Sequence, residues 1–266
     1  MLAQQRRQRI MDELERRGAA RVSELAAKLD VSEMTVRRDL EALAREGSVV
    51  KVHGGATLPV ARATDEPGFE AKSGRQRDEK EAIADAAAAL VQPGMAIALT
   101  AGTTTWAMAA RLGGVESLTV VTNSINVSDV LRREGRPDQT IVLVGGVRTP
   151  SDALVGPIAL ASLRTLHVDM TFMGVHGMAA DAGYTTPNLL EAETNKAFVE
   201  AASRLVVVAD HSKWGVKGLC SIAPLARAAV VVSDAALPAS ARSALGELGV
   251  EVVAATLASD VIDEVG

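Results

Sequence analysis

The chain has 266 residues, of which 48% are hydrophobic, and it carries a formal net charge of −5 and one cysteine, Cys220. This length and composition suit two globular domains, and a lone cysteine excludes an intramolecular disulfide and a cysteine-based metal cluster. No apolar run could span a bilayer, and the first residues lead into an amphipathic segment rather than a signal peptide. We therefore expect a cytoplasmic protein without a metal or cofactor.

The charge is distributed unevenly along the chain. Residues 1–57 contain 11 Lys and Arg against 9 Asp and Glu, a net of +2, whereas residues 58–266 carry a net of −7. A mildly basic small region beside a larger acidic one fits a single nucleic-acid contact surface. Aromatic residues make up only 2% of the chain, which argues against the base-stacking platforms of single-strand binders.

Residues 4–17 are expected to form a first helix that Gly18 ends. Residues 22–40 then predict two short helices joined by a tight turn, with Ser23 capping the first helix and Ser32 the second. The positions expected to be buried recur at helical spacing; they are Ile10, Met11, Leu14, Val22, Leu25, Ala26, Leu29, Val36, Leu40 and Leu43.

The second helix of this pair has an outward face that carries arginines near its N-terminal end. Met34 and Arg38 are expected to point directly away from the core, with Thr35 and Arg37 beside them. Such a face suits a helix that enters the major groove of DNA. A solvated charged face on an ordinary amphipathic helix pair is the alternative.

The residues after this helix favour the DNA-binding interpretation. Gly47 is expected to end the helix, residues 48–52 predict a short strand, residues 53–55 a turn and residues 56–58 the return strand. Residues 1–57 are therefore predicted to be a winged helix-turn-helix domain, and residues 58–75 a linker. The expected DNA contacts are Ser32, Met34, Thr35, Arg37 and Arg38 on the helix and Lys51 and His53 on the wing.

From residue 76 onward, short apolar strands alternate with helices, which predicts a parallel sheet with both faces covered. The expected strands are 95–99, 118–122, 141–144, 170–173, 205–209, 229–233 and 250–254. The expected helices are 76–91, 103–112, 124–133, 157–165, 189–203 and 238–248. Residues 76–266 are therefore predicted to form a Rossmann-like α/β domain.

Polar residues follow several of these strands, where open parallel sheets bind their ligands. A glycine among hydroxyls, between a strand and a helix, can cradle a phosphate through backbone N–H groups; an ordinary capped helix start is the alternative. Arg148 and Lys213 are candidate phosphate partners. The expected effector contacts are Thr100, Gly102, Thr103, Thr104, Thr105, Asn123, Gly145, Gly146, Arg148, Asp210 and Lys213.

Both halves of the chain resemble the DeoR family of bacterial transcription regulators. In the first half the matching residues are Arg9-Ile10, Val22 to Ala26, Val31-Ser32, Thr35 to Leu40, Leu43, Gly47 and His53 to Ala56. In the second half they are Phe69-Glu70, Glu79-Lys80, Gly102 to Thr104, Thr122 to Ser124, Gly145-Gly146, Gly156, Asp169, Gly174, Gly183, Glu191, Lys196, Asp210 and Ser212-Lys213.

The resemblance implies that the second half binds a phosphorylated sugar or a related metabolite, and that its fold is related to ribose-5-phosphate isomerase and the CoA transferases. It adds Glu191 and Lys196 to the expected effector contacts. The sequence departs from the family at two places. Thr100 and Ala101 replace the usual Asp or Ser followed by Ser, and Lys72 replaces the usual Arg after Phe69-Glu70.

A sugar-phosphate isomerase fused to a DNA-binding domain is the competing hypothesis. Proton abstraction needs a base within reach of the substrate, and residues 173–177, which correspond to an acidic segment of those isomerases, contain no carboxylate. Glu191 and Glu193 are two residues apart and so face different sides of a helix. A plain interaction protein would leave both the arginine face and the Gly-Thr-Thr loop unexplained.

We therefore expect a regulator, and not an enzyme, that represses a sugar-catabolic operon in response to a phosphorylated sugar. It is expected to bind double-stranded operator DNA as a homodimer or homotetramer, because one small recognition helix gives too little specificity and duplex sites are usually repeated.

Overall fold

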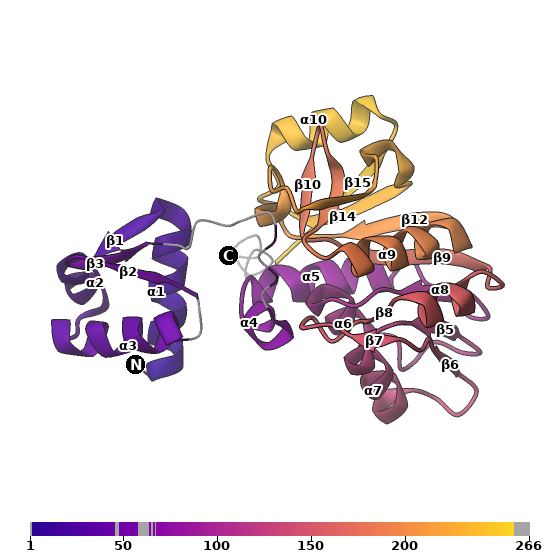
Figure 1. Ribbon diagram of the computed structural model, residues 1–266, viewed down its shortest axis with the longest axis horizontal. Helices are drawn as coiled ribbons and strands as arrows, with labels where there is room; N and C mark the ends of the chain where they lie inside the picture. Colours follow the sequence, from indigo (N-terminus) through magenta and orange to yellow (C-terminus); the bar gives the residue numbers. More distant parts are fainter. Residues whose placement is uncertain (1, 46–47, 58–63, 65, 67, 258–266) are drawn as a thin grey trace, which may run out of the picture. The chain divides into compact units, whose positions relative to one another are not determined.

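The computed structural model describes residues 2–45, 48–57, 64, 66 and 68–257. The chain divides into two compact units, Met1–Arg62 and Ala63–Gly266, and each is described by itself (Figure 1). Within the described ranges, no helix combines the length and the hydropathy that crossing a bilayer requires.

The first unit is a winged helix-turn-helix. Its described elements are α1 (Ala3–Arg17), β1 (Ala19–Arg21), α2 (Val22–Leu29), α3 (Glu33–Arg45), β2 (Val50–Val52) and β3 (Gly55–Thr57). The strands form an antiparallel sheet in the order β1-β3-β2. All ten positions that helical spacing predicts to be buried are buried. They form one aliphatic core between the helices and the sheet.

The helix ends follow the predictions in part. Gly18 ends α1 with a φ of 74°, and the Ser32 hydroxyl accepts a hydrogen bond from the Thr35 N–H at 3.2 Å, as a cap of α3 should. The prediction for Ser23 is wrong, because the N-cap of α2 is Arg21, two residues earlier, and the helix has no side-chain cap. The expected helix end at Gly47 and the continuation of the return strand to residue 58 lie outside the described residues.

The second unit is built on a seven-stranded sheet in the order β15-β14-β12-β9-β4-β5-β6. Every neighbouring pair is parallel. The strands are β4 (Ala96–Leu99), β5 (Thr119–Thr122), β6 (Thr140–Leu143), β9 (Val168–Gly174), β12 (Ala202–Val208), β14 (Val230–Asp234) and β15 (Glu251–Ala255). These are the seven strands predicted from sequence, and the parallel-sheet α/β fold is confirmed.

Helices cover both faces of this sheet, because successive strand residues point to opposite sides. Ile97 and Leu99 pack in the core under α5 (Arg77–Ala88), α6 (Thr103–Ala109) and α7 (Ile125–Glu134). Ala98 packs instead with residues of α8 (Pro157–Leu163) and α9 (Leu189–Ala201). A further core on the α9 side includes residues of α10 (Ala239–Glu247) (Figure 1).

Several short elements were not predicted, because two to five residues carry too little periodicity. They are α4 (Phe69–Ser73), the hairpin β7 (Val147–Arg148) and β8 (Leu154–Val155), the small sheet of β10 (Gly177–Ala179), β11 (Gly183–Thr186) and β13 (Cys220–Ala223), and the 3-10 turns η1 (His211–Lys213) and η2 (Leu225–Arg227). The helix α4 lies in the segment expected to be a linker. Its Phe69 ring meets the Trp106 ring edge to face, with the centroids 5.8 Å apart.

Candidate functional sites

The outer side of α3 presents the predicted arginine face to solvent. Met34 is 60% exposed, and Arg37 and Arg38 are both exposed. Arg37 is held by Glu33 at 2.9 Å. Among the described residues Arg38 has no hydrogen-bond or ion-pair partner, so its guanidinium is free to contact another molecule.

An ion pair on the inner side of α3 fixes that helix against α1. The Arg6 guanidinium donates to both carboxylate oxygens of Asp39, at 2.5 and 3.2 Å, and both side chains are nearly buried. Such a two-pronged contact fixes orientation as well as distance. Asp39 was not predicted to have a structural role, although its position three residues after the buried Val36 indicates an inward-facing carboxylate.

The wing carries the two other predicted DNA contacts. Lys51 on β2 and His53 in the turn are exposed, and the Lys51 ammonium lies 3.1 Å from the Glu41 carboxylate of α3. An ion pair this exposed contributes little stability, so exchanging Glu41 for a DNA phosphate costs little.

We expect Lys51→Ala to weaken operator binding with little change in sequence preference, because a wing lysine contributes charge toward phosphates. Affinity should be measured on the operator and on a scrambled duplex at several salt concentrations, and the salt slope should fall by about one. Lys217→Ala, which removes an exposed lysine of the second unit, is the matched control. A loss confined to the operator would instead mean that the wing reads bases.

The loop after β4 is tied to the neighbouring strand ends. The Thr100 hydroxyl accepts from the Gly174 N–H at 3.2 Å. The side-chain oxygen of Asn123, Oδ1, accepts from the Ala101 N–H at 2.9 Å. The Thr105 hydroxyl donates back to the Thr100 carbonyl at 2.7 Å. The hydrogen bonds of Thr100, Thr105 and Asn123 therefore fix the conformation of the loop.

Thr103 and Thr104 differ from their neighbours in this loop. Their hydroxyls have no hydrogen-bond partner within the described part of the chain, although both residues are largely buried. Gly102 is extended, with φ 166° and ψ 160°, and a Cβ there would lie 3.2 Å from the Thr105 hydroxyl. The bare backbone and two free hydroxyls are the part of the loop that can receive a ligand.

The end of β12 places Asp210 and Lys213 at the same edge of the sheet. Asp210 is completely buried, and its Oδ1 accepts from the Ser212 N–H at 3.1 Å. Its Oδ2 has no partner among the described residues. Asp234 anchors this turn by accepting from the His211 N–H at 2.7 Å and contacting His211 Nδ1 at 2.8 Å. The hydrogen bond to Asp234 raises the pKa of His211.

Lys72, which is half-buried, and Lys80, which is buried, were not predicted as site residues. Together with Lys213 they form a cationic group, here called the lysine cluster. Lys80 donates to the backbone carbonyls of Lys72, at 2.6 Å, and of Arg75. Burial lowers the pKa of Lys80 to about 8, against the opposing charge of Asp210. Burial also lowers the pKa of Lys72, and the charge of Lys213 adds to both effects. Mutually repelling cations of this kind favour an anion between them.

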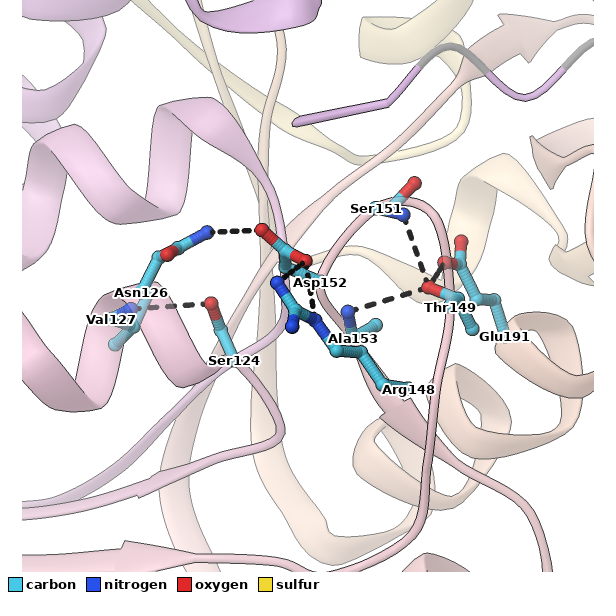
Figure 2. A network of polar contacts seen from close by, with 9 residues as sticks. All are labelled: Ser124, Asn126, Val127, Arg148, Thr149, Ser151, Asp152, Ala153 and Glu191. Carbon is cyan, nitrogen blue, oxygen red and sulfur yellow. Dashed lines mark hydrogen bonds and ion pairs between the residues drawn. The ribbon is translucent and has the colours of Figure 1, made fainter. Parts of the chain in front are cut away.

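Glu191 faces this cluster from α9. Its carboxylate accepts from the hydroxyls of Thr149, at 2.7 Å, and Thr186, at 3.3 Å. Burial and the neighbouring Glu66 carboxylate raise the pKa of Glu191, and the charge of Lys72 opposes this. Figure 2 shows that the Thr149 hydroxyl also accepts hydrogen bonds from the N–H groups of Ser151 and Ala153. These bonds hold the turn between β7 and β8.

Arg148 and Lys196 are placed apart from this group. In Figure 2 the Arg148 guanidinium points toward Asp152, with which it forms an ion pair at 2.6 Å, and not toward Thr149 and Glu191. Lys196 pairs with Glu193 at 2.8 Å, in an exposed contact along α9. The structure therefore does not bring these two predicted effector contacts to the lysine cluster.

The two glycines predicted beside Arg148 have a packing role. Gly146 has a φ of 143°, and a Cβ there would lie 2.5 Å from the Val155 carbonyl of β8. A Cβ on Gly145 would lie 2.9 Å from the Ile158 side chain. Glycine is required at position 146, because the Val155 backbone of β8 leaves no room for a side chain. At Gly145 the close atom belongs to the exposed Ile158 side chain, which can move aside.

The sequence matches two family descriptions, one in each unit. Residues 6–61 match the DeoR-like helix-turn-helix domain, and residues 75–235 match the DeoR C terminal sensor domain. The chain is 37% identical over 246 residues to the uncharacterized HTH-type transcriptional regulator YgbI of Escherichia coli, covering 92% of this chain and 95% of that one. It is 34% identical over 258 residues to the uncharacterized regulator YulB of Bacillus subtilis, covering 97% and 98%. It is 30% identical over 242 residues to the glycerol-3-phosphate regulon repressor of Escherichia coli, covering 91% and 94%.

Similar solved structures span about half of each chain. Ribose 5-phosphate isomerase A from Methanocaldococcus jannaschii aligns with a TM-score of 0.38 and 20% identity, over 53% of this chain and 55% of that one. The eIF2B delta subunit from Chaetomium thermophilum aligns with a TM-score of 0.39 and 16% identity, over 53% and 50%.

Proposed function

This chain belongs to the DeoR family of transcription regulators, and from that premise we propose that it represses a sugar-catabolic operon under the control of a phosphorylated sugar. It is a regulator and not an enzyme. A relative named as the glycerol-3-phosphate regulon repressor supports a phosphorylated metabolite as the signal.

One observation carries the proposal for the effector: unsatisfied groups of complementary kinds meet at the carboxyl ends of the strands. The Lys213 ammonium and the Thr103 and Thr104 hydroxyls are donors suited to a phosphate. The free Oδ2 of Asp210 is an acceptor suited to a sugar hydroxyl. A site that presents both kinds of group discriminates strongly against ligands that lack one of them.

For DNA, we propose that α3 enters the major groove with Met34, Thr35, Arg37 and Arg38 toward the bases and backbone. Ser32 starts that helix, and Lys51 and His53 flank it on the wing. A homodimer or homotetramer would bring two such helices to repeated half-sites.

Thermal stability in the presence of metabolites tests the effector proposal. The full-length protein should be stabilised by one or a few phosphorylated sugars and not by the same sugars without phosphate, because the lysine cluster recognises the anion. A ligand at about 100 times its dissociation constant adds about 2.7 kcal/mol. Equal stabilisation by a sugar and its phosphate, or no stabilisation by any phosphorylated sugar, would contradict the proposal.

A further inference from the structure

An acidic side chain of the protein itself occupies donor groups beside the lysine cluster. Glu66 lies in the segment between β3 and α4. Its Oε2 accepts from the Asn188 amide at 2.8 Å, and its Oε1 accepts from the Ser151 hydroxyl at 3.1 Å. The Ser151 oxygen in turn accepts from the Lys72 ammonium at 2.8 Å. Glu66 is thus joined to one lysine of the cluster through a single hydroxyl.

The surroundings of Glu66 suit an anion in general and not glutamate in particular. Asn188 caps α9, a helix of 13 residues, by accepting from the N–H groups of Leu190 and Glu191, and the positive end of a helix dipole attracts negative charge. Lys72 places positive charge near this site, and its ammonium donates a hydrogen bond to the Ser151 hydroxyl that contacts Glu66. The buried Oδ2 of Asp210, whose charge acts on Lys80, has no partner among the described residues.

The position of Glu66 is nevertheless unfavourable in one respect. Its carboxylate neighbours that of Glu191, which is half-buried and already accepts from two threonine hydroxyls. Two carboxylates close together repel when both are ionised. Burial raises the pKa of Glu191, and the charge of Glu66 and its hydrogen bond with Glu191 raise it further for this reason. Removing Glu66 from its donors relieves that unfavourable interaction.

The segment that carries Glu66 is fastened to the second unit immediately afterwards. The Phe69 N–H donates to the Pro150 carbonyl at 3.3 Å, and the Phe69 ring rests on Trp106. On its other side, Glu66 follows the last residue of β3, Thr57, by nine positions. Glu66 thus contacts the candidate effector site three residues before the anchor at Phe69.

We propose that Glu66 is an internal competitor of the effector, and that an anion binding at the lysine cluster takes its donors and releases the connecting segment. This inference rests on the proposed function, since it names how that same site communicates with the DNA-binding unit. The ligand must bind one arrangement better than the other for regulation to occur. The two arrangements here are Glu66 bound to Asn188 and Ser151, and Glu66 displaced from them by the anion.

Trp106 provides a reporter for this exchange, because Phe69 covers its ring and Glu66 lies three residues earlier. In full-length protein carrying Trp214→Phe, fluorescence then comes from Trp106, the remaining tryptophan of the sequence. Inorganic phosphate is the probe, titrated at constant ionic strength with chloride as the balancing anion. Glu66→Gln removes the competing charge at nearly constant shape. Glu70→Gln removes the same charge from an exposed position on α4 and is the matched control.

We expect phosphate to change the Trp106 emission. Glu66→Gln should bind phosphate about 5-fold or more tightly than the parent, which is within the usual range of coupling free energies between sites. Glu70→Gln should bind as the parent does. Equal or weaker phosphate binding by Glu66→Gln would overturn the competition, since Glu66 would then be a bystander or a ligand contact. Phosphate binding with no change in Trp106 emission would overturn the release of the segment.

The experiment separates this inference from the function on which it rests. Phosphate binding by all three proteins with equal affinity refutes the competition alone and leaves the anion site standing. The absence of phosphate binding in every variant, measured also by calorimetry, refutes the anion site and the competition together.

Discussion

Replacing Lys213 with alanine is expected to leave operator binding intact and to abolish the response to the effector. The Lys213 ammonium has no partner within the described residues, so the substitution removes the proposed ligand contact without breaking an internal bond. Coupling between effector and operator is typically about 1–3 kcal/mol, or roughly 5- to 150-fold in affinity, and the variant should lose it. The measurement is operator affinity with and without the metabolite that stabilises the wild-type protein.

Thr103→Val tests the same site from the loop after β4. Valine keeps the volume of threonine and removes a hydroxyl that makes no internal hydrogen bond, so the fold should persist while the response weakens or disappears. Lys217→Ala, in an exposed ion pair with Asp181 on the same unit, is the charge-matched control and should respond normally. A wild-type response in both Lys213→Ala and Thr103→Val would mean that the effector binds elsewhere.

The parts of this fold that could be predicted are those in which burial imposes a repeat. Val36, Leu40 and Leu43 recur at helical spacing and are all buried. The seven strands of the large sheet are mostly apolar, as in Ala96–Leu99 of β4, because helices cover both faces of the sheet. The polar strand ends could also be anticipated, since parallel strands bring their carboxyl ends to one edge. Asn123, Asp210 and the Gly102 loop do meet the same edge of the sheet.

The parts that could not be predicted depend on pairs of residues far apart in the sequence. Nothing around Glu66 indicates that Asn188 and Ser151 will bind it, more than 80 positions away. Lys80 sits in a helix rich in charged residues, and its burial follows from the approach of α4. The packing role of Gly55 could not be predicted for the same reason. A Cβ at this position would lie 2.3 Å from the Ala20 carbonyl oxygen of the neighbouring strand, so only glycine fits.

The structure also gives different surroundings to two residues that the sequence makes equally plausible as phosphate partners. Arg148 follows the paired glycines, and Lys213 follows Asp210, so each could be a phosphate partner. Arg148 is satisfied by Asp152, which also receives the Asn126 amide at 3.1 Å (Figure 2). Lys213 is left without a partner in the described structure. The difference lies in a turn of the β7–β8 hairpin, which no local pattern specifies.

Arg38→Ala is expected to reduce operator affinity by about 1–3 kcal/mol if Arg38 reads a base, with no loss of stability. The guanidinium is exposed and has no partner among the described residues, so truncation breaks no internal contact. Affinity for the operator and for a scrambled duplex should be compared at several salt concentrations, together with the unfolding midpoint. A similar loss on both duplexes, with a smaller salt slope, would assign Arg38 to a phosphate instead.

Arg37→Ala provides the comparison, because Arg37 differs from its neighbour in being paired with Glu33 at 2.9 Å. That ion pair is exposed and contributes about 0–1 kcal/mol of stability. Arg37 must break it to contact DNA, so we expect Arg37→Ala to lower operator affinity less than Arg38→Ala does. Glu33→Gln would then release Arg37 and increase affinity on all duplexes alike. Unchanged operator affinity in both arginine variants would show that α3 does not enter the groove by this face. Its charged side would then be a solvated surface, as on any amphipathic helix.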